Sequence, residues 1–274
     1  MYNWQFVHCV DFWAIVLASA CDTQTEVENG CQESELKPLI YPLVQIGLGA
    51  IKYVLSPAIS TSRCDTFPRL TSAIRFAPFH FQIIRSLLHL ANHTHTYIPI
   101  SPYLLPILTL SLSSSHRPKQ STIRPPDFEV QIRAPQQYLK TRVYAECLVE
   151  ETIFLLAEWL ASRNVQGSIA FPEVIVPVVV TLRKALKNSK SLSKGSGKEL
   201  GIVKGLVERI EESSNWVELK RKTAMTASGG IMPLEIWDSE MKTQVDDSPL
   251  GRYVQLMRKT REKRRKLVAK VSLF

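Results

Sequence analysis

The sequence predicts an all-α protein, an α-solenoid of stacked helices that ends in a basic helical tail. Apolar residues recur at steps of three and four along most of the 274 residues, and no strand or hairpin pattern competes convincingly. Some helical stretches are apolar on two faces, which is typical of helices contacted from more than one direction. Because no strict sequence period is visible, the repeats would be degenerate, of the HEAT or armadillo kind.

The first half of the chain predicts four helices, at residues 4–21, 36–55, 79–91 and 103–112. Pro38 and Pro42 fall near the start of the second helix, where a missing N–H group costs little. The stretches that follow the second and the fourth of these helices are rich in Ser, Thr, Arg and Pro. They predict mobile loops at about 56–78 and 113–135.

The second half predicts three longer helices. Residues 138–162 are apolar on nearly all sides, which places this helix in the middle of the stack. Residues 171–187 hold β-branched runs that could form a buried strand, but Pro177 cannot donate to a sheet ladder, so a helix is favoured. Residues 198–222 show the clearest helical periodicity. The predicted domains are a helical repeat region at 1–225, a linker at 226–248 and a basic tail at 249–274.

Composition narrows the class of protein. Five cysteines are odd in number and follow no zinc spacing, which indicates reduced thiols in a nuclear or cytosolic compartment. The Ala-Ser-Ala at 18–20 resembles a signal-peptidase site, but no Lys or Arg precedes it and Asp11 interrupts the apolar stretch. A buried amphipathic helix is therefore favoured over a secretory leader. No run of ~18 uninterrupted apolar residues predicts a membrane span.

The C-terminal tail carries most of the charge. Residues 249–274 hold nine Lys or Arg and one acid, whereas the preceding 248 residues hold 25 basic and 24 acidic side chains. If residues 258–266 are helical, charge encircles the segment without the apolar face that a membrane-surface helix needs. Contact with RNA phosphates, or a nuclear targeting signal, suits it better. The candidate residues are Arg252, Arg258, Lys259, Arg261, Lys263, Arg264, Arg265 and Lys266.

Other patterns predict no catalytic chemistry, metal site or cofactor. His89, His93 and His95 have no carboxylate or Cys nearby to complete a metal site. The Gly-Ser-Gly-Lys run at 195–198 lacks the remaining residues of a phosphate-binding loop. Cys147 has no base beside it, and the glutamates at 150, 151 and 158 do not converge on one point, so a solvated edge or a partner contact is expected for them.

Three tryptophans are candidates for partner anchors, because aromatic side chains are favoured at binding hot spots. They are Trp159, Trp216 and Trp237. Packing in the core is the default expectation for each of them.

Several runs in order along the chain resemble the nucleolar complex protein 2 family of ribosome-assembly factors. The runs are NWQFVHCVD at 3–11, PLIYPLVQ at 38–45, IRSL at 84–87, YIP at 97–99, LVEE at 148–151, GSIAFPE at 167–173, VKGLVE at 203–208 and PLGRY at 249–253. Members of that family are longer, so this chain resembles their C-terminal portion. The segment at 56–78 departs from the family pattern and looks inserted.

The resemblance implies a helical-repeat scaffold without catalysis. It implies a place in the nucleus, nucleolus and nucleoplasm, and partners among the other nucleolar complex proteins and precursors of the large (60S) ribosomal subunit. With the basic tail, it leads us to expect contact with pre-ribosomal RNA and none with membranes. The alternative is a protein–protein adaptor whose tail is only a nuclear or nucleolar targeting signal.

Overall fold

A computed structural model describes residues 2–22, 34–55, 74–112, 124–139, 141–192, 197–227, 237, 240–241 and 244–272. Within these ranges the chain is helical, which confirms the all-α prediction, and no strand is formed. The helices are α1 Trp4–Ala20, α3 Ile40–Leu55, α5 Ala77–Thr94, α6 Ser101–Leu112, α7 Arg142–Leu160, α8 Arg163–Gln166, α9 Phe171–Leu192, α10 Gly197–Ala227 and α12 Pro249–Ser272. Two short 3-10 turns, η1 Lys37–Leu39 and η4 Val245–Asp247, precede α3 and α12.

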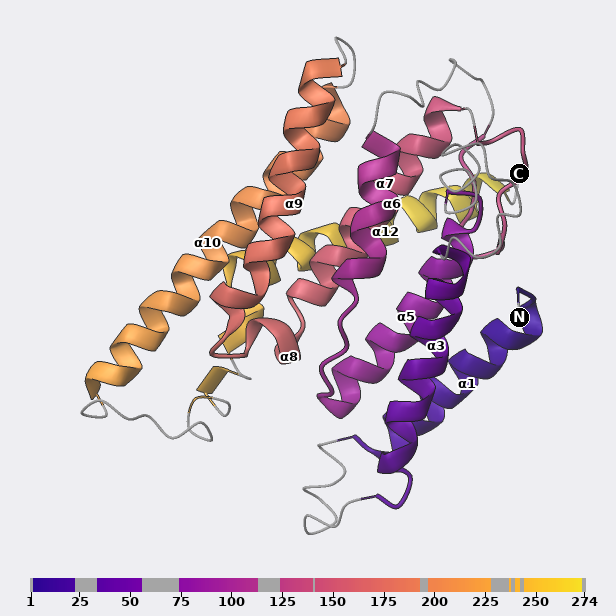
Figure 1. Ribbon diagram of the computed structural model, residues 1–274. Coiled ribbons are helices and arrows are strands. Elements are labelled where there is room, and N and C mark those ends of the chain that lie inside the picture. Colours follow the sequence, from indigo (N-terminus) through magenta and orange to yellow (C-terminus); the bar gives the residue numbers. More distant parts are fainter. Residues whose placement is uncertain are drawn as a thin grey trace, which may run out of the picture.

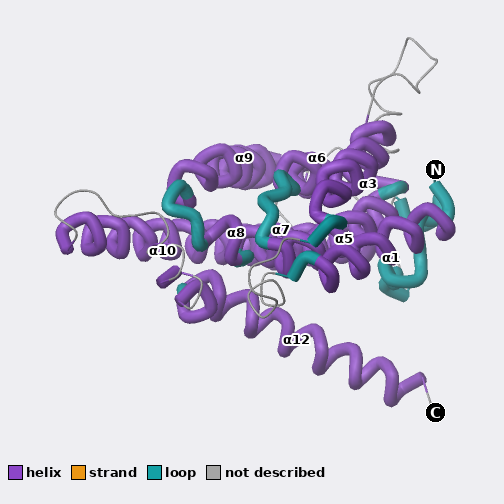
Figure 2. Tube along the Cα trace, turned by 90° about the horizontal axis from the view of Figure 1, so that it is seen from below, coloured by secondary structure: helices purple, strands orange, loops and turns teal. Residues whose placement is uncertain are grey.

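The helices form two layers (Figures 1 and 2). One layer holds α3, α6 and α9, and the other holds α1, α5, α7 and α10. Packing of α5 against α1, α3 and α7, of α6 against α7 and α9, and of α10 against α9 links the array from end to end. Helix α12 crosses the outer side of the second layer and contacts α10 and α7. The layered stack is the arrangement that helices with two apolar faces require, and its repeat character stays a prediction.

Side-chain oxygens fix the starts of two helices. The Asn3 side chain accepts a hydrogen bond from the Phe6 N–H at 2.9 Å, and the Thr141 hydroxyl accepts one from the Tyr144 N–H at 3.3 Å. Each oxygen satisfies a backbone donor that the first helical turn leaves without a partner. Thr141 also explains why α7 begins four residues after the predicted start at 138.

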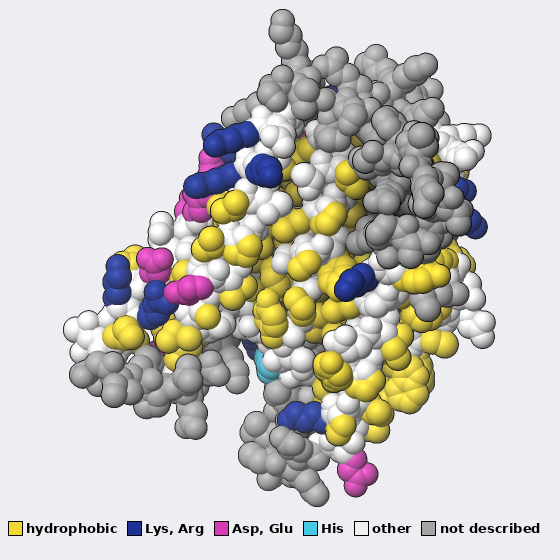
Figure 3. All heavy atoms as spheres, in the orientation of Figure 1, with side chains coloured by type: hydrophobic (Ala, Val, Ile, Leu, Met, Phe, Trp, Pro, Cys, Tyr) yellow, Lys and Arg dark blue, Asp and Glu magenta, His cyan; other side chains and the backbone are white. Residues whose placement is uncertain are grey.

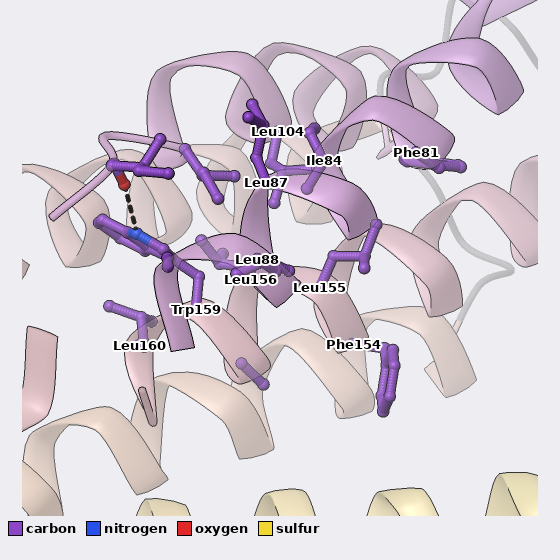
Figure 4. Packing of buried hydrophobic residues seen from close by; sticks show 14 of the residues in the cluster. Phe81, Ile84, Leu87, Leu88, Leu104, Phe154, Leu155, Leu156, Trp159 and Leu160 are labelled. Atoms are coloured by element: carbon purple, nitrogen blue, oxygen red, sulfur yellow. Dashed lines mark hydrogen bonds between the residues drawn. The ribbon is translucent and has the colours of Figure 1, made fainter. Parts of the chain in front are cut away.

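Helix α7 lies in the centre of the core, as its apolar circumference predicts. Figure 4 shows α7 side chains packed against residues of α5 and α6. Phe154, Leu155 and Leu156 are buried, and so are Leu87 of α5 and Leu104 of α6. Burial of one such side chain contributes about 1.5–3 kcal/mol.

The 171–187 segment is the helix α9, so the helical interpretation was correct. Pro177 lies inside this helix, where it removes one backbone donor. Helix α10 extends beyond the predicted 198–222 at both ends.

The described parts of the predicted loops and linker pack against the helices. The Ile74 carbonyl accepts a hydrogen bond from the Tyr144 hydroxyl at 2.7 Å, and the Phe128 carbonyl accepts one from Gln82 Nε2 at 2.7 Å. In the predicted linker, Val245 is fully buried. The rest of 56–78 up to residue 73, and residues 113–123, lie outside the described residues.

Candidate nucleic-acid interface

Helix α12 starts inside the core and not as a separate tail. The Ser248 hydroxyl accepts a hydrogen bond from the Gly251 N–H at 2.9 Å, and the Leu250 N–H donates to Ser213 Oγ of α10 at 2.9 Å. Leu250 and Val254 are buried. A Cβ at Gly251 would lie 2.5 Å from the Val245 carbonyl oxygen, so only glycine permits this close approach. The first turns of α12 are therefore fixed to the body.

A buried carboxylate holds the middle of α12. Glu151 of α7 accepts from Arg261 Nη2 at 2.5 Å and from Arg85 Nη2 of α5 at 2.7 Å, and its side chain is only 6% exposed. Burial alone would raise the pKa of Glu151, but the charges and hydrogen bonds of Arg261 and Arg85 outweigh it and hold that pKa below its usual value. The Arg261 guanidinium also lies 3.8 Å from the centroid of the Phe154 ring. One carboxylate thus ties three helices together.

Three more arginines of α12 face acids of the body. Arg258 Nε lies 2.8 Å from Glu158 Oε1, and Arg264 Nη1 lies 3.4 Å from Glu150 Oε2. A third pair joins Arg265 and Glu129. Because these arginine side chains are more than half exposed, each pair contributes little by itself, about 0–1 kcal/mol. The four arginines form one row along the side of α12 that faces the body; we call Arg258, Arg261, Arg264 and Arg265 the inner row.

The remaining cations of α12 are all exposed. Lys266 pairs with Glu262 of the same helix at 2.7 Å, and the other four have no ion-pair partner within the described ranges. We call these five residues the outer row: Arg252, Lys259, Lys263, Lys266 and Lys270. Positive charge therefore lies on two opposite sides of α12: four arginines face the body, whereas the four lysines and Arg252 face away from it.

The sequence did not identify the acids that hold α12. It predicted a solvated edge or a partner contact for Glu150, Glu151 and Glu158, and nothing in it marked Glu129 as a partner of α12. The available signal was Glu151, a carboxylate in the middle of a stretch whose apolar circumference predicts burial. A buried carboxylate requires a cation, and the excess of cations lies in α12.

Two of the three candidate tryptophans belong to the core. Trp159 Nε1 donates to the Ile98 carbonyl at 2.7 Å (Figure 4), and Trp237 Nε1 donates to the Gly167 carbonyl at 2.8 Å. Both side chains are 2% exposed, so neither can reach a partner in this structure. Trp216 is half-buried against the core, with Lys220 Nζ 5.7 Å from its ring centroid.

A polar hollow of about 380 Å³ lies where the ends of α5 and α7 meet the start of α12. Its charged groups are opposed in pairs. Arg258 faces Glu158, Arg163 Nη2 lies 3.8 Å from Asp246, and His93 Nδ1 lies 3.6 Å from Asp22.

The remaining candidate residues have separate contacts and form no common site among the described residues. His95 bonds Asn164 at 3.0 Å, and the ring centroids of His89 and His93 are 4.6 Å apart. No cluster of three metal-ligating side chains forms among the described residues. Burial, followed by the charges of neighbouring glutamates, raises the pKa of the Cys147 thiol to about 11. Residues 195 and 196 of the Gly-Ser-Gly-Lys run lie outside the described residues, and residues 197 and 198 begin α10.

The face opposite α12 has a different character. In Figure 3 hydrophobic side chains spread over the layer of α3, α6 and α9, with few charges near its centre. Helix α6 contains no charged residue. Exposed apolar side chains on the flanking helices include Ile46 and Tyr53 of α3 and Val176 and Val180 of α9. We call the outer side of this layer the apolar face.

In its described parts the protein is all-helical, with a cationic surface along α12 and an apolar face over α3, α6 and α9. No described helix is long and apolar enough to span a bilayer. Comparison with known proteins then identifies the family of this chain. The Noc2p family profile matches residues 1–65 and 64–257, and the chain belongs to this family.

Similar proteins include one from fission yeast, one from fly and one from plant. An uncharacterized NOC2 family protein of Schizosaccharomyces pombe is 35% identical over 269 residues, which cover 97% of this chain and 33% of the relative. Nucleolar complex protein 2 of Drosophila melanogaster is 26% identical over 270 residues, 97% of this chain and 30% of the relative. Nucleolar complex-associated protein 2 of Arabidopsis thaliana is 26% identical over 269 residues, which cover 96% of this chain and 30% of the relative. The chain spans about a third of the length of these relatives.

Proposed function

We propose that this chain acts as a non-catalytic scaffold in the assembly of the large ribosomal subunit, in the nucleolus and nucleoplasm. Membership of the Noc2p family supports this role, and two relatives carry the nucleolar complex in their names. The proposed ligands are pre-ribosomal RNA and the other nucleolar complex proteins.

The observation that carries RNA binding is the attachment of α12. A basic segment with no contact to the body is often only a solvated tail. Here α12 is instead a helix that is fixed at Leu250, Val254 and Glu151 and still exposes five cations. A cationic surface held rigidly beside a nearly neutral body attracts a polyanion and keeps its charges in place for phosphate contacts.

Truncation after Met257 tests this role. The variant keeps Leu250 and Val254 in the core and removes the inner row together with all of the outer row except Arg252. We expect salt-sensitive retention of RNA in a filter assay to be lost, and co-purification with nucleolar proteins to persist after ribonuclease treatment. Unchanged RNA retention at low salt would contradict the proposal.

The apolar face is the proposed site for another nucleolar complex protein. Stable protein interfaces are depleted of charged residues at their centre, and α6 supplies an uncharged centre between exposed Ile46 and Val180. Contiguous apolar surface on a protein commonly marks a contact with another protein. The half-buried Trp216 stays a second, separate candidate for partner contact.

The alternative function is an adaptor whose basic helix serves only as a nuclear or nucleolar targeting signal. The same cations favour it, because Lys- and Arg-rich runs of this length direct nuclear import. Fusing residues 249–274 to a neutral reporter tests targeting by itself. A reporter that moves to the nucleolus, together with a purified chain that ignores RNA, would support the adaptor over the RNA-binding scaffold.

A further inference from the structure

The two rows of α12 differ in direction, in partners and in residue type. With about 100° between successive residues of a helix, Arg252, Lys259, Lys263, Lys266 and Lys270 fall within an arc of about 60°. Their spacing of seven, four, three and four residues keeps them on one side. The inner row occupies the opposite side, where Glu129, Glu150, Glu151 and Glu158 approach it.

We infer that the outer row alone is the phosphate-contacting edge of this protein, and that the inner row serves to attach the helix. This inference rests on the proposed RNA-binding function and assigns it to one face. The inner arginines are already neutralised by carboxylates, so they would have to break ion pairs before they could bind phosphate. The outer cations are exposed and, apart from Lys266, form no ion pair within the described residues.

The residue types fit this division. All four inner cations are arginines, whose planar guanidinium suits fixed carboxylate pairs. Four of the five outer cations are lysines, which are compact, strongly hydrated charges on flexible stems. Such side chains can follow a phosphate backbone whose path differs from one sequence to the next, and contacts of this kind carry little sequence information.

The length of the row identifies the ligand as an extended polyanion. From Arg252 to Lys270 the helix rises by about 27 Å, so neighbouring cations stand about 7 Å apart on average. A single small anion would engage one or two of them, whereas a nucleic-acid strand can engage all five. An anionic membrane is disfavoured, because among the α12 side chains that the structure describes the large exposed apolar ones are just Leu256 and Leu267.

Two charge-matched variants of the whole chain test the inference. The outer variant is K259Q/K263Q/K270Q and the control is R258Q/R264Q/R265Q. Each removes three positive charges, and neither touches the buried Arg261–Glu151 pair. Binding of a labelled single-stranded oligouridine is measured by fluorescence anisotropy between about 50 and 200 mM salt, with circular dichroism to verify the helical content of both variants.

We expect the outer variant to lose roughly 10- to 100-fold in affinity and the magnitude of its salt slope to fall by about 2. The control should change affinity less than about threefold, because its arginines are already neutralised. Equal losses in both variants, or a larger loss in the control, would overturn the inference. If the wild-type chain ignores the RNA, the proposed function itself fails. Row-dependent binding to phosphatidylserine vesicles in preference to RNA would also overturn the inference.

Discussion

Different forces hold the face that carries α12 and the opposite face of α3, α6 and α9. The two faces also expose different kinds of side chain. Helix α12 is fixed by hydrophobic contacts over its first turns and by carboxylates further along, and it exposes charge. The apolar face is part of layers held by burial of side chains, and it exposes uncharged surface. The comparison teaches that one stack of helices can expose a cationic face and an apolar face, each held by a different kind of contact. The charged face is the one whose attachment depends on a few specific residues.

The largest expected effect follows from removing the carboxylate at the centre of the charged face. Glu151→Ala would leave Arg85 and Arg261 close together without their shared partner. We expect a loss of about 2–3 kcal/mol in the free energy of unfolding, below the 3–5 kcal/mol of a fully buried pair because both arginines are partly exposed. Urea unfolding measures this loss, and limited proteolysis should show earlier cleavage within α12.

Glu158→Ala is the matched control, because it removes a carboxylate whose arginine is 55% exposed. Its cost should stay below about 1 kcal/mol. Equal effects of the two substitutions would mean that the buried pair does not hold α12 more firmly than a surface pair.

His80 sharpens the comparison, since it is an ionisable side chain buried without the partners that Glu151 has. It is fully buried in α5, both ring nitrogens lack a hydrogen bond, and burial lowers its pKa from 6.5 to about 3. Between these two values the unfolded chain binds a proton that the folded protein refuses, so stability falls as the pH falls through this window.

We expect this single group to cost roughly 2 kcal/mol at pH 5 relative to pH 8. His80→Leu should remove that part of the pH dependence and stabilise the protein at neutral pH by about 1 kcal/mol, because an unsatisfied donor is lost. Chemical denaturation at both pH values measures the difference. Parallel pH dependence in the two proteins would show that His80 is solvated or paired.

The carboxyl group of Glu151 changes the stability of the protein in the acidic pH range. Its pKa is held below its usual value, so its contribution to stability is complete above an ordinary glutamate pKa of about 4.5 and is lost as the pH falls below that value. Release of α12, followed by its sensitivity to proteolysis, should therefore begin only in acid. Release near neutral pH would contradict the ion-pair account.

The apolar face should show the smallest effect on stability and a clear effect on binding. Val180 is 59% exposed, so Val180→Asp should change the free energy of unfolding by no more than about 0.5 kcal/mol. Together with Ile46→Asp it should abolish co-purification with nucleolar proteins. Val178, two residues away and 1% exposed, is the control: Val178→Asp should unfold the protein. Normal co-purification of the double variant would exclude this face as the interface.

The sequence predicted the helices well because their signal is local. Apolar periodicity located seven helical stretches, and Thr141 shows why the start of α7 differs from the prediction: a cap depends on one hydroxyl. For Trp159 and Trp237 the carbonyl that accepts from each indole was not predictable, since it lies more than sixty residues away in the chain.

The division of α12 into two rows was only half predictable. The spacing of Lys259, Lys263 and Lys266 places them on one side of a helix. Which side faces the body depends on glutamates about 100 residues earlier, as for Arg258 and Glu158. Pairings over that distance leave no local pattern.

The central claim, that α12 binds RNA with its outer row, is tested most directly by lysine acetylation footprinting of the whole chain with and without RNA. The account predicts that RNA protects Lys259, Lys263, Lys266 and Lys270 from acetylation, while exposed lysines of the body such as Lys52 and Lys184 react equally in both samples. Protection of the body lysines, or unchanged reactivity along α12 when RNA is bound, would contradict it.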